Sequence, residues 1–324
     1  MHDYLQGKTV VVTGAAGFLG SHLCDRLIEN GSEVIGIDNF VTGRKKNLAH
    51  LEGNESFRFI EANVNVDPEL YMADVVPDVI LHFASPASPP SYQKHPIETY
   101  LVNAYATHLL LSFLKSKNPN ARFLFAGTSE AYGDPSVHPQ PESYWGNVNP
   151  NGIRSCYDES KRMGETVCGV FHREFGMDTR IVRIFNTYGP RMNPEDGRVI
   201  PNLAMQALRG EALTIYGDGT QTRSYCYVDD LIAGILTFLV HPELAGETLN
   251  IGNPEEFSIL ETADAIQDIV GETERTFEDL PGDDPTKRQP DISKALSLLD
   301  WKPSVTFTEG LVKTIEYFKT ELFV

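Results

Sequence analysis

The sequence predicts an α/β fold built on a doubly wound parallel sheet. Short β-branched runs alternate with segments of helical apolar spacing, which is the pattern of repeated β–α units. The first unit is the clearest, because a β-branched run at 8–13 leads into three glycines at 14–20 and then into helical spacing at 21–30. At 324 residues the chain is long enough to bury the large core that such a sheet requires.

Composition and charge exclude several classes of protein. The chain is 41% hydrophobic and 22% charged, and its net charge of −18 argues against non-specific nucleic-acid binding. A specific phosphate site remains compatible with that charge, because a few local arginines outweigh a distant acidic surface. No apolar run is long enough to span a bilayer, and residues 1–7 have no signal core. We therefore expect a cytoplasmic protein with neither a membrane nor a nucleic-acid partner.

The cysteines predict neither a disulfide nor a metal site. Cys24, Cys156, Cys168 and Cys226 lie far apart or in helical sequence, with no C-x-x-C pair and no Cys/His metal spacing. Structural zinc sites need such short spacings to bring their ligands together. We expect reduced thiols and no bound metal.

The N-terminal glycines predict a dinucleotide site. Gly14, Gly17 and Gly20 stand between the first strand and the first helix, and a second strand at 33–38 ends on the carboxylate of Asp38. In this context, backbone N–H groups and the helix dipole face a pyrophosphate, and the acid accepts hydrogen bonds from the adenosine ribose. The arrangement is that of a Rossmann-type fold.

Charge near the second strand bears on the choice between NAD and NADP. Asp38 would repel a 2′-phosphate, which favours NAD. Arg44, Lys45 and Lys46 follow closely and are the contrary indication, because they would attract that phosphate. We predict NAD.

A second set of residues predicts redox chemistry at a carbinol carbon. Residues 123–126 form an apolar strand, and Thr128 follows at its carboxyl end, where open α/β sheets place their chemistry. Tyr157 and Lys161 are four residues apart at the start of a helix predicted over 160–173, so they share one face. A positive charge beside Tyr157 lowers its pKa and lets it take the hydroxyl proton as hydride leaves the carbon.

The chain resembles a known family over nearly its whole length. The spacing G-x-x-G-x-x-G is similar to that of the extended short-chain dehydrogenases/reductases. Five further segments are similar to UDP-glucuronate decarboxylases: residues 84–90, 128–135, 143–150, 183–192 and 283–291.

That resemblance implies a reaction. UDP-glucuronate is oxidised at C4, carbon dioxide leaves the 4-keto intermediate, and hydride returns to give UDP-xylose. Ser129-Glu130 follows Thr128, whereas 4,6-dehydratases usually have Asp-Glu, so the acid that would protonate a leaving hydroxyl is absent. Glu130 is the candidate for ordering a water or proton relay, and Ser129 and Arg288 are the candidates for orienting the carboxylate.

Other functions remain open. A UDP-glucuronate 4-epimerase shares every step before carbon dioxide loss, and other NAD-dependent nucleotide-sugar epimerases or dehydratases share the first step. Leu101, Leu109 and Ser116 replace polar or basic residues common in the family, which keeps the epimerase alternative open. A catalytically silent protein on the same fold is a third alternative, and the intact Thr128, Tyr157 and Lys161 argue against it.

The resemblance also implies which residues hold the ligands. Residues 79–84 resemble the strand that ends beside the nicotinamide, and Asn63 stands where the family often has an aspartate against adenine. The implied contacts to NAD are Gly14, Gly17, Phe18, Leu19, Gly20, Asp38, Asn39, Phe40, Thr42, Gly43, Asn63, Val64, Phe83, Ala84, Ser85, Tyr157 and Lys161. The implied contacts to the UDP-sugar are Ser85, Asn186, Arg198, Tyr216, Arg223 and Arg288.

The resemblance finally implies a smaller, interleaved C-terminal α/β substrate-binding domain and a homodimer. We expect the NAD-binding Rossmann domain at 1–185 and 224–252, and the nucleotide-sugar domain at 186–223 and 253–324. Residues 97–117 carry apolar side chains on most sides, which fits a dimer through a helix bundle or a fully internal helix.

Overall fold

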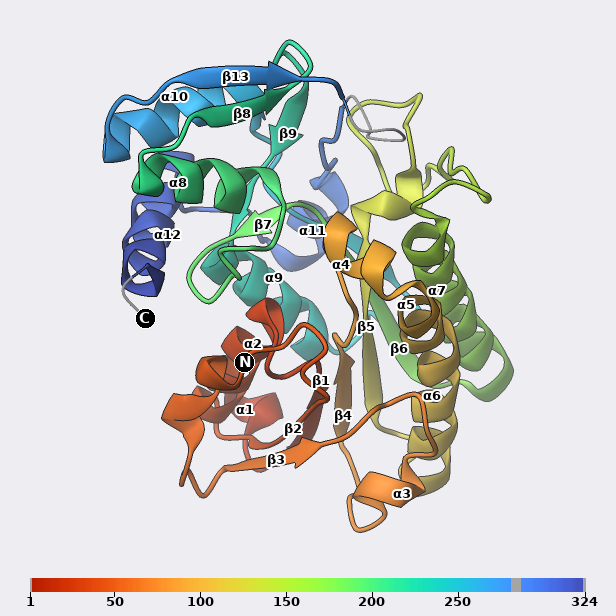
Figure 1. Cartoon of the computed structure of the whole chain (residues 1–324). Helices are drawn as coiled ribbons and strands as arrows, with labels where there is room; N and C mark the ends of the chain where they lie inside the picture. Colours follow the sequence, from red (N-terminus) through yellow and green to blue (C-terminus); the bar gives the residue numbers. More distant parts are fainter. Residues whose placement is uncertain (1, 281–286, 323–324) are drawn as a thin grey trace.

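The computed structural model describes residues 2–280 and 287–322 and is built on a seven-stranded sheet (Figure 1). All its neighbouring strands are parallel, in the order β11-β6-β5-β4-β1-β2-β3. Its strands are β1 (Thr9–Thr13), β2 (Glu33–Asp38), β3 (Phe57–Glu61), β4 (Val79–His82), β5 (Arg122–Thr128), β6 (Asp178–Ile184) and β11 (Thr248–Ile251). The predicted doubly wound parallel sheet is confirmed. Residues 283–286 of the last family-like segment lie outside the described residues.

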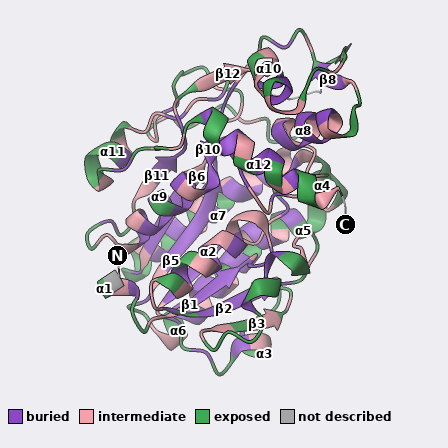
Figure 2. Ribbon diagram, turned by 90° about the vertical axis from the view of Figure 1, so that its left-hand side faces the viewer, coloured by how far each residue is buried: buried purple, intermediate pink, exposed green. Residues whose placement is uncertain are grey.

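Alternation along each strand creates two hydrophobic cores. Successive side chains of a strand point to opposite faces of the sheet. Val10 and Val12 of β1 therefore join the core on one face, whereas Val11 joins the core on the other. The central strands β1, β4 and β5 are buried on both sides, whereas the edge strand β3 is partly exposed (Figure 2).

Helices cover both faces of the sheet. Helices α2 (Phe18–Glu29) and α9 (Val228–Val240) pack against the core that holds Val10, and α6 (Ala106–Lys117) and α7 (Ser155–Phe175) pack against the core that holds Val11. The shorter helical segments are α1 (His2–Leu5), η1 (Lys45–Asn47), η2 (Ala49–Leu51), α3 (Glu69–Met72), α4 (Pro89–Lys94), α5 (Pro96–Tyr100) and η4 (Ser129–Tyr132). None of the helices in the described part of the chain is both long and apolar enough to cross a bilayer.

A smaller group of elements lies over the edge at which the parallel strands end (Figure 1). It contains three two-stranded sheets: β7 (Thr187–Tyr188) with β10 (Cys226–Tyr227), β8 (Leu213–Tyr216) with β13 (Arg275–Glu278), and β9 (Thr222–Ser224) with β12 (Glu256–Ser258). Its helices are α8 (Val199–Arg209), α10 (Ile259–Val270), α11 (Ser293–Leu299) and α12 (Phe307–Glu321). Its apolar side chains continue the core that holds Val10, so the two groups of elements share one hydrophobic interior.

Two helices differ from the sequence expectation. Helix α7 begins at Ser155, five residues before the predicted start, so Tyr157 lies inside its first turn. Between α5 and α6 the chain forms one π-helical turn, η3 (Leu101–Tyr105). A Cβ on Gly164 of α7 would lie 2.6 Å from the Asn103 carbonyl oxygen, so only glycine allows α7 to pack this closely against η3.

Candidate active site

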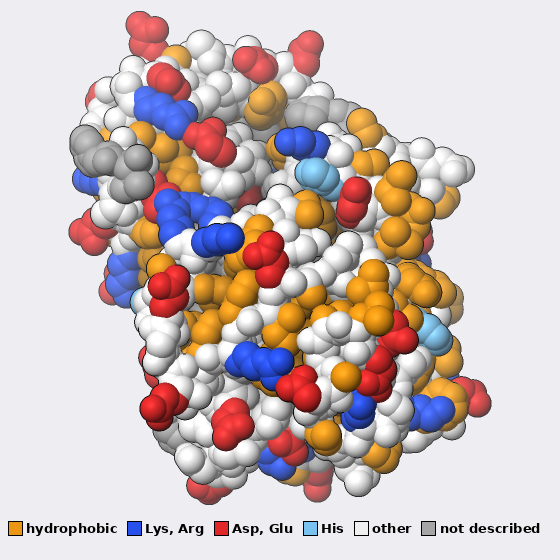
Figure 3. All heavy atoms as spheres, turned by 60° about the horizontal axis from the view of Figure 1, so that its bottom comes forward, with side chains coloured by type: hydrophobic (Ala, Val, Ile, Leu, Met, Phe, Trp, Pro, Cys, Tyr) orange, Lys and Arg blue, Asp and Glu red, His pale blue; other side chains and the backbone are white. Residues whose placement is uncertain are grey.

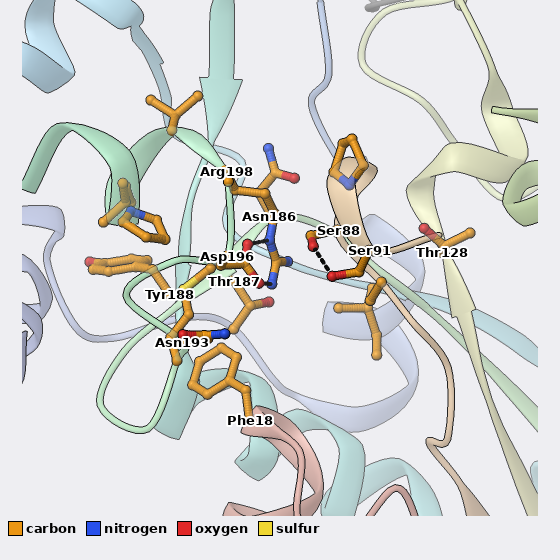
Figure 4. A pocket seen from close by; sticks show the side chains of 18 of the residues that line it. Phe18, Ser88, Ser91, Thr128, Asn186, Thr187, Tyr188, Asn193, Asp196 and Arg198 are labelled. Carbon is orange, nitrogen blue, oxygen red and sulfur yellow. Dashed lines mark hydrogen bonds and ion pairs between the residues drawn. The ribbon is translucent and has the colours of Figure 1, made fainter. Parts of the chain in front are cut away.

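A cavity of about 550 Å³ opens where the smaller group of elements meets the sheet. A second cavity of about 80 Å³ adjoins it, and Gly14, Gly17 and Phe83 line both. Figure 4 shows side chains of Phe18, Thr128 and Arg198, which come from three distant segments, around the larger cavity. The parallel strands and the crossovers between them bring these segments together.

The glycine loop leaves room for an anion at the start of α2. Gly14 has φ +73°, and a Cβ there would lie 2.7 Å from the Ala84 amide nitrogen. A Cβ on Gly20 would lie 2.0 Å from the Gly14 carbonyl oxygen. Gly17 is the N-cap residue of α2, and no side chain forms a capping hydrogen bond there. The first turn of α2 contains no acidic residue. The free N–H groups and the helix dipole therefore face the cavity uncompensated, as a pyrophosphate requires.

Asp38 fits a ribose rather than a 2′-phosphate. Its carboxylate accepts hydrogen bonds from the backbone N–H groups of Ala16, at 3.0 Å, and Phe40, at 2.8 Å. Burial raises the pKa of Asp38, and the backbone hydrogen bonds oppose that rise. Asn39 and Thr42 line the small cavity beside Asp38, and a Cβ on Gly43 would lie 2.7 Å from the Asp38 carboxylate.

The cations near this loop are bound to carboxylates of the protein. Arg44 and Lys46 both form ion pairs with Glu321 of α12, and Lys45 lies 3.8 Å from Glu61. Glu321 offsets one of the two charges of Arg44 and Lys46, so the contrary indication for NADP is weakened.

The remaining predicted cofactor residues fall into two places. Leu19, like Phe18, lines the larger cavity, whereas Asn63, Val64 and Ala84 line the small one, and Ser85 lines both. The side-chain oxygen of Asn63 accepts a hydrogen bond from the Asn65 amide at 2.9 Å, so a local turn already uses one of its lone pairs. The backbone N–H groups at the start of α2, the glycine loop and the small cavity beside Asp38 together fit a dinucleotide.

Thr128, Tyr157 and Lys161 meet at the carboxyl end of β5. The side chain of Thr128 is hydrogen-bonded to the Tyr157 hydroxyl and also accepts the Glu130 amide at 3.2 Å. The Lys161 ammonium donates to the Ala126 carbonyl oxygen at 2.8 Å and lies 5.7 Å from the centre of the Tyr157 ring. The sequence-predicted catalytic set is therefore brought together in one buried site.

Burial moves both titrating groups of this set. Burial raises the pKa of Tyr157 to about 12, although its hydrogen bond to Thr128 acts in the opposite direction. Burial also lowers the pKa of Lys161 to about 7, against the attraction of Glu165. The tyrosine therefore needs a nearby positive charge in order to act as a base at neutral pH.

Glu130 lies between two guanidinium groups. Its carboxylate is 2.5 Å from Arg154 and 3.0 Å from Arg288. Arg288 also donates to the Ser129 hydroxyl and to the Gly133 carbonyl oxygen, each at 3.0 Å. Burial raises the pKa of Glu130, but the charges of Arg288 and Arg154 outweigh burial and hold it at about 2. Glu130 is thus a fixed anion at neutral pH.

Sequence reasoning missed two residues of this site. Arg154 lines the cavity and stands three residues before Tyr157, a helical spacing that could have identified it. Tyr92 of α4 stacks on Tyr157 with ring centres 5.0 Å apart and planes inclined by 11°. No local pattern marks Tyr92, because packing between α4 and α7 sets its position.

The predicted nucleotide-sugar residues line the same larger cavity. Asn186, Arg198, Tyr216 and Arg223 all contribute to its wall, as Arg288 does at the reaction end. Arg198 is held by both carboxylate oxygens of Asp196, as the dashed lines in Figure 4 mark. Arg223 is largely buried and donates to the Thr222 carbonyl oxygen at 2.8 Å.

The three residues that depart from the family pattern lie elsewhere. Leu101 belongs to η3, and Leu109 and Ser116 belong to α6. None of them is among the residues that line either cavity in the described part of the chain. The departure therefore does not alter the wall around Thr128 and Tyr157.

Comparisons with known proteins agree with this geometry. Residues 10–252 match the model of the NAD dependent epimerase/dehydratase family. The chain is 49% identical to UDP-glucuronic acid decarboxylase 1 of Xenopus tropicalis, covering 97% of this chain and 73% of the relative. It is 48% identical to UDP-glucuronic acid decarboxylase 1 of Arabidopsis thaliana, covering 97% and 70%.

Solved structures show the same fold. An epimerase from Methanothermobacter thermautotrophicus superposes with a TM-score of 0.90 at 28% identity, covering 99% of this chain and 95% of that one. UDP-glucuronic acid 4-epimerase from Bacillus cereus, in complex with UDP-glucuronic acid and NAD, gives a TM-score of 0.86 at 34% identity, covering 97% and 99%. The chain therefore belongs to the NAD dependent epimerase/dehydratase family, in the branch whose curated members are named UDP-glucuronic acid decarboxylases.

Proposed function

We propose that the chain is an NAD-dependent decarboxylase that converts UDP-glucuronate to UDP-xylose and carbon dioxide. The observation that carries the proposal is the pairing of Glu130 with Arg154 and Arg288 directly beside Thr128 and Tyr157. The names of relatives at 48–50% identity over nearly the whole chain support the same reaction.

The chemistry follows from a hydroxyl placed at Thr128 and Tyr157. Bound NAD supplies the hydride acceptor for C4 of the sugar and later the hydride donor. Tyr157 takes the C4 hydroxyl proton, and the Lys161 ammonium favours the tyrosinate that accepts it. Thr128 and the protonated Tyr157 then hydrogen-bond the C4 oxygen as it gains charge. The bond between C5 and the carboxylate carbon then breaks, and carbon dioxide leaves. The electrons of that bond form an enolate over C5, C4 and the C4 oxygen, and C5 then takes up one proton.

The negative charge of Glu130 affects how strongly the site stabilises the carboxylate of the substrate. The carboxylate carbon is bonded to C5, the neighbour of C4, so it must lie close to Tyr157 and hence to the group of Glu130, Arg154 and Arg288. Glu130 compensates both guanidinium groups, so the substrate carboxylate gains less stabilisation than two free arginines would give. Because Glu130 stays ionised, we assign it the ordering of a water or of the sugar rather than the donation of a proton.

We assign the ligand contacts accordingly. The NAD-contacting set is the one predicted above, centred on the glycine loop, Asp38 and the strand ends at Val64 and Ala84. The UDP-sugar contacts are assigned to Ser85, Asn186, Arg198, Tyr216, Arg223 and Arg288. Support comes from their places in the walls of the two cavities.

A 4-epimerase is the second candidate, because the Bacillus cereus 4-epimerase shares the fold at 34% identity. Leu101 no longer favours it, since that side chain does not line the cavity. Proton NMR of the purified protein with UDP-glucuronate and NAD discriminates the two. We expect UDP-xylose and carbon dioxide. Formation of UDP-galacturonate with the carboxylate retained would overturn the decarboxylase proposal, and a Tyr157→Phe variant gives the baseline without turnover.

We also propose the interleaved division predicted from the sequence, with 1–185 and 224–252 forming the NAD-binding part and the remainder forming the sugar-binding part. The sheet supports it, because β11 returns to pair with β6 after the excursion through β7, β8, β9 and β10.

The four cysteines are all free in the structure, which supports a reducing, cytoplasmic location.

The oligomer we propose is a homodimer through α5, η3, α6 and α7. Large apolar side chains are exposed along these helices, including Tyr100, Tyr105 and Met163, which are 47%, 49% and 51% exposed. Figure 3 shows apolar side chains gathered at the right-hand edge of the molecule, the side on which Figure 1 draws these helices. Light scattering of a Tyr105→Glu/Met163→Glu variant should give a monomer. Leu70→Glu, at an exposed apolar residue of α3, is the matched control and should leave the dimer intact.

A further inference from the structure

Asp158 is a buried carboxyl group that the reaction above does not use. It follows Tyr157 in the first turn of α7 and is only 7% exposed. One of its oxygens lies 3.9 Å from the Arg154 guanidinium, and the other is buried without a hydrogen-bond partner. A buried carboxylate oxygen without a donor is costly, whereas a protonated carboxyl group has a hydrogen to offer and no full charge to solvate.

A second anion is paired with the same guanidinium group. Arg154 binds Glu130 at 2.5 Å, while Asp158 stands farther away, so Glu130 takes the stronger share of the cation. Like charges in one buried site cannot both ionise freely, and the more weakly paired group keeps its proton. Burial, followed by the charge of Glu130, raises the pKa of Asp158 to about 7.

The charged and titratable groups that face Asp158 come from several elements. Three of them are on other elements: Glu130 on η4, Tyr92 on α4 and Arg288 on the segment after residue 286. The others are on or beside the start of α7: Arg154, Cys156, Tyr157 and Glu159. Arg154 lines the larger cavity and Asp158 does not, so we argue the effect of Asp158 on the substrate through this guanidinium, 3.9 Å away.

The geometry points to Asp158 as a positioning residue that takes up a proton when a uronate carboxylate enters the cavity. Resting on the proposed function, the inference follows from charge: the incoming carboxylate adds an anion to a group that already holds Glu130 and Asp158 beside Arg154. Glu130 is held by two close guanidinium contacts and cannot give way. Protonation of Asp158 releases Arg154 from its weaker partner without leaving a buried charge uncompensated.

The step balances as a simple association. One solvent proton adds to the Asp158 carboxylate as the nucleotide-sugar binds, and no bond of the substrate changes. A nucleotide-sugar without the C6 carboxylate brings no third anion and takes up no additional proton. Wild-type affinity for UDP-glucuronate, relative to UDP-xylose, therefore falls by about tenfold for each pH unit above the pKa of Asp158.

Titration calorimetry tests this directly. We would use the NAD-loaded protein in a Tyr157→Phe background, which prevents turnover, and titrate UDP-glucuronate and UDP-xylose in phosphate and in Tris. The dependence of the heat on buffer ionisation gives the protons taken up. We expect uptake approaching one proton per site at pH 8 for UDP-glucuronate only. Asp158→Asn should abolish the uptake and flatten the pH dependence of the affinity ratio, and Asp158→Glu should restore both.

Glu159→Gln is the matched control, because it removes the adjacent carboxylate, which faces Arg162 at the surface. Unchanged uptake in Asp158→Asn, or equal uptake with both nucleotide-sugars, overturns the inference. Circular dichroism and NAD content establish that each variant is folded. If binding of UDP-glucuronate takes up no proton but the protein with Tyr157 intact converts it to UDP-xylose, the inference fails alone. If it is not converted, the proposed function fails.

Discussion

The cofactor end and the reaction end of the cavity hold their carboxylates by different means. Asp38 is held by backbone N–H groups of Ala16 and Phe40, which lie within its own β–α–β unit. Glu130 is held by guanidinium groups from residues 154 and 288, which are distant in sequence. Backbone donors stay in place when side chains change, whereas each guanidinium depends on a single residue. The reaction end is therefore the more sensitive to substitution.

The largest effect should come from Tyr157→Phe. This substitution removes the only group proposed to accept the C4 hydroxyl proton, and positioned acid–base groups contribute about 10²–10⁴-fold to rates. We expect kcat for UDP-xylose formation to fall by about 10³-fold while bound NAD is retained. Tyr71→Phe, at a buried hydroxyl on α3 away from the cavity, is the control and should keep full activity. Retained activity in Tyr157→Phe would remove the proposed base.

Arg288→Met should reduce kcat/KM more than the substitution of any side chain at the cofactor end. It removes the 3.0 Å pair with Glu130 and the hydrogen bonds to Ser129 and Gly133, which together fix the start of η4. A displacement of about 1 Å at a reacting centre can cost roughly 10²-fold, so we expect kcat/KM to fall by about that factor. Arg209→Met, at a surface pair with Glu195, is the matched substitution and should be silent. Equal effects of the two would contradict the comparison.

Asp38→Asn should have a milder effect at the cofactor end. The amide keeps an oxygen for one of the two backbone donors, and it loses the charge that favours ribose hydroxyls and repels a 2′-phosphate. A hydrogen bond to a charged group contributes about 1.5–3 kcal/mol, so NAD affinity should fall by at least about tenfold. NADP affinity should fall less, which fluorescence titration of both cofactors would reveal. An unchanged ratio of the two affinities would show that Asp38 does not select the cofactor.

Lys161→Met should change stability in the direction opposite to activity. The pKa of Lys161 is about 7 in the folded protein and 10.5 ordinarily, so between these values the unfolded chain binds a proton that the folded chain releases. Stability from this residue therefore rises with pH across that window, and the penalty is complete below pH 7. Thermal unfolding at pH 6.5 should show a melting temperature about 5 °C higher in the inactive variant, with a smaller gain at pH 10. A lower melting temperature at pH 6.5 would contradict the burial cost.

The same difference between the two ends decides what the sequence could predict. The glycine loop and Asp38 could be identified because strand, turn and helix follow one another in the chain. Thr128, Tyr157 and Lys161 could be identified because each sits at a strand end or at helical spacing. Tyr92 escaped because tertiary packing, not local pattern, brings it to Tyr157. Arg154 has a helical spacing from Tyr157, but its pairing with Glu130 depends on the fold.

The structure bears on two of the expectations. Leu101 appeared to bear on the substrate, but its side chain lines neither cavity, although Val102 of the same π-helical turn lines the small one. Glu130 is predicted to order a water or proton relay, and that role stays a prediction; the structure adds that Arg154 and Arg288, unseen as its partners in the sequence, hold it as an anion. Sequence motifs identify which residues are present at a site, whereas the ionisation state depends on neighbours that only the fold supplies.

The ion pairs of Glu321 carry a consequence for how this fold changes its cofactor. Glu321, near the end of α12, compensates Arg44 and Lys46, and Arg44 also lines the larger cavity. Loss of that one carboxylate would leave two cations beside the ribose loop without altering the loop itself. A mutation of Glu321 in α12, far from the loop in the sequence, can therefore shift the cofactor preference from NAD toward NADP. Comparisons of cofactor choice among descendants of this fold should include that helix.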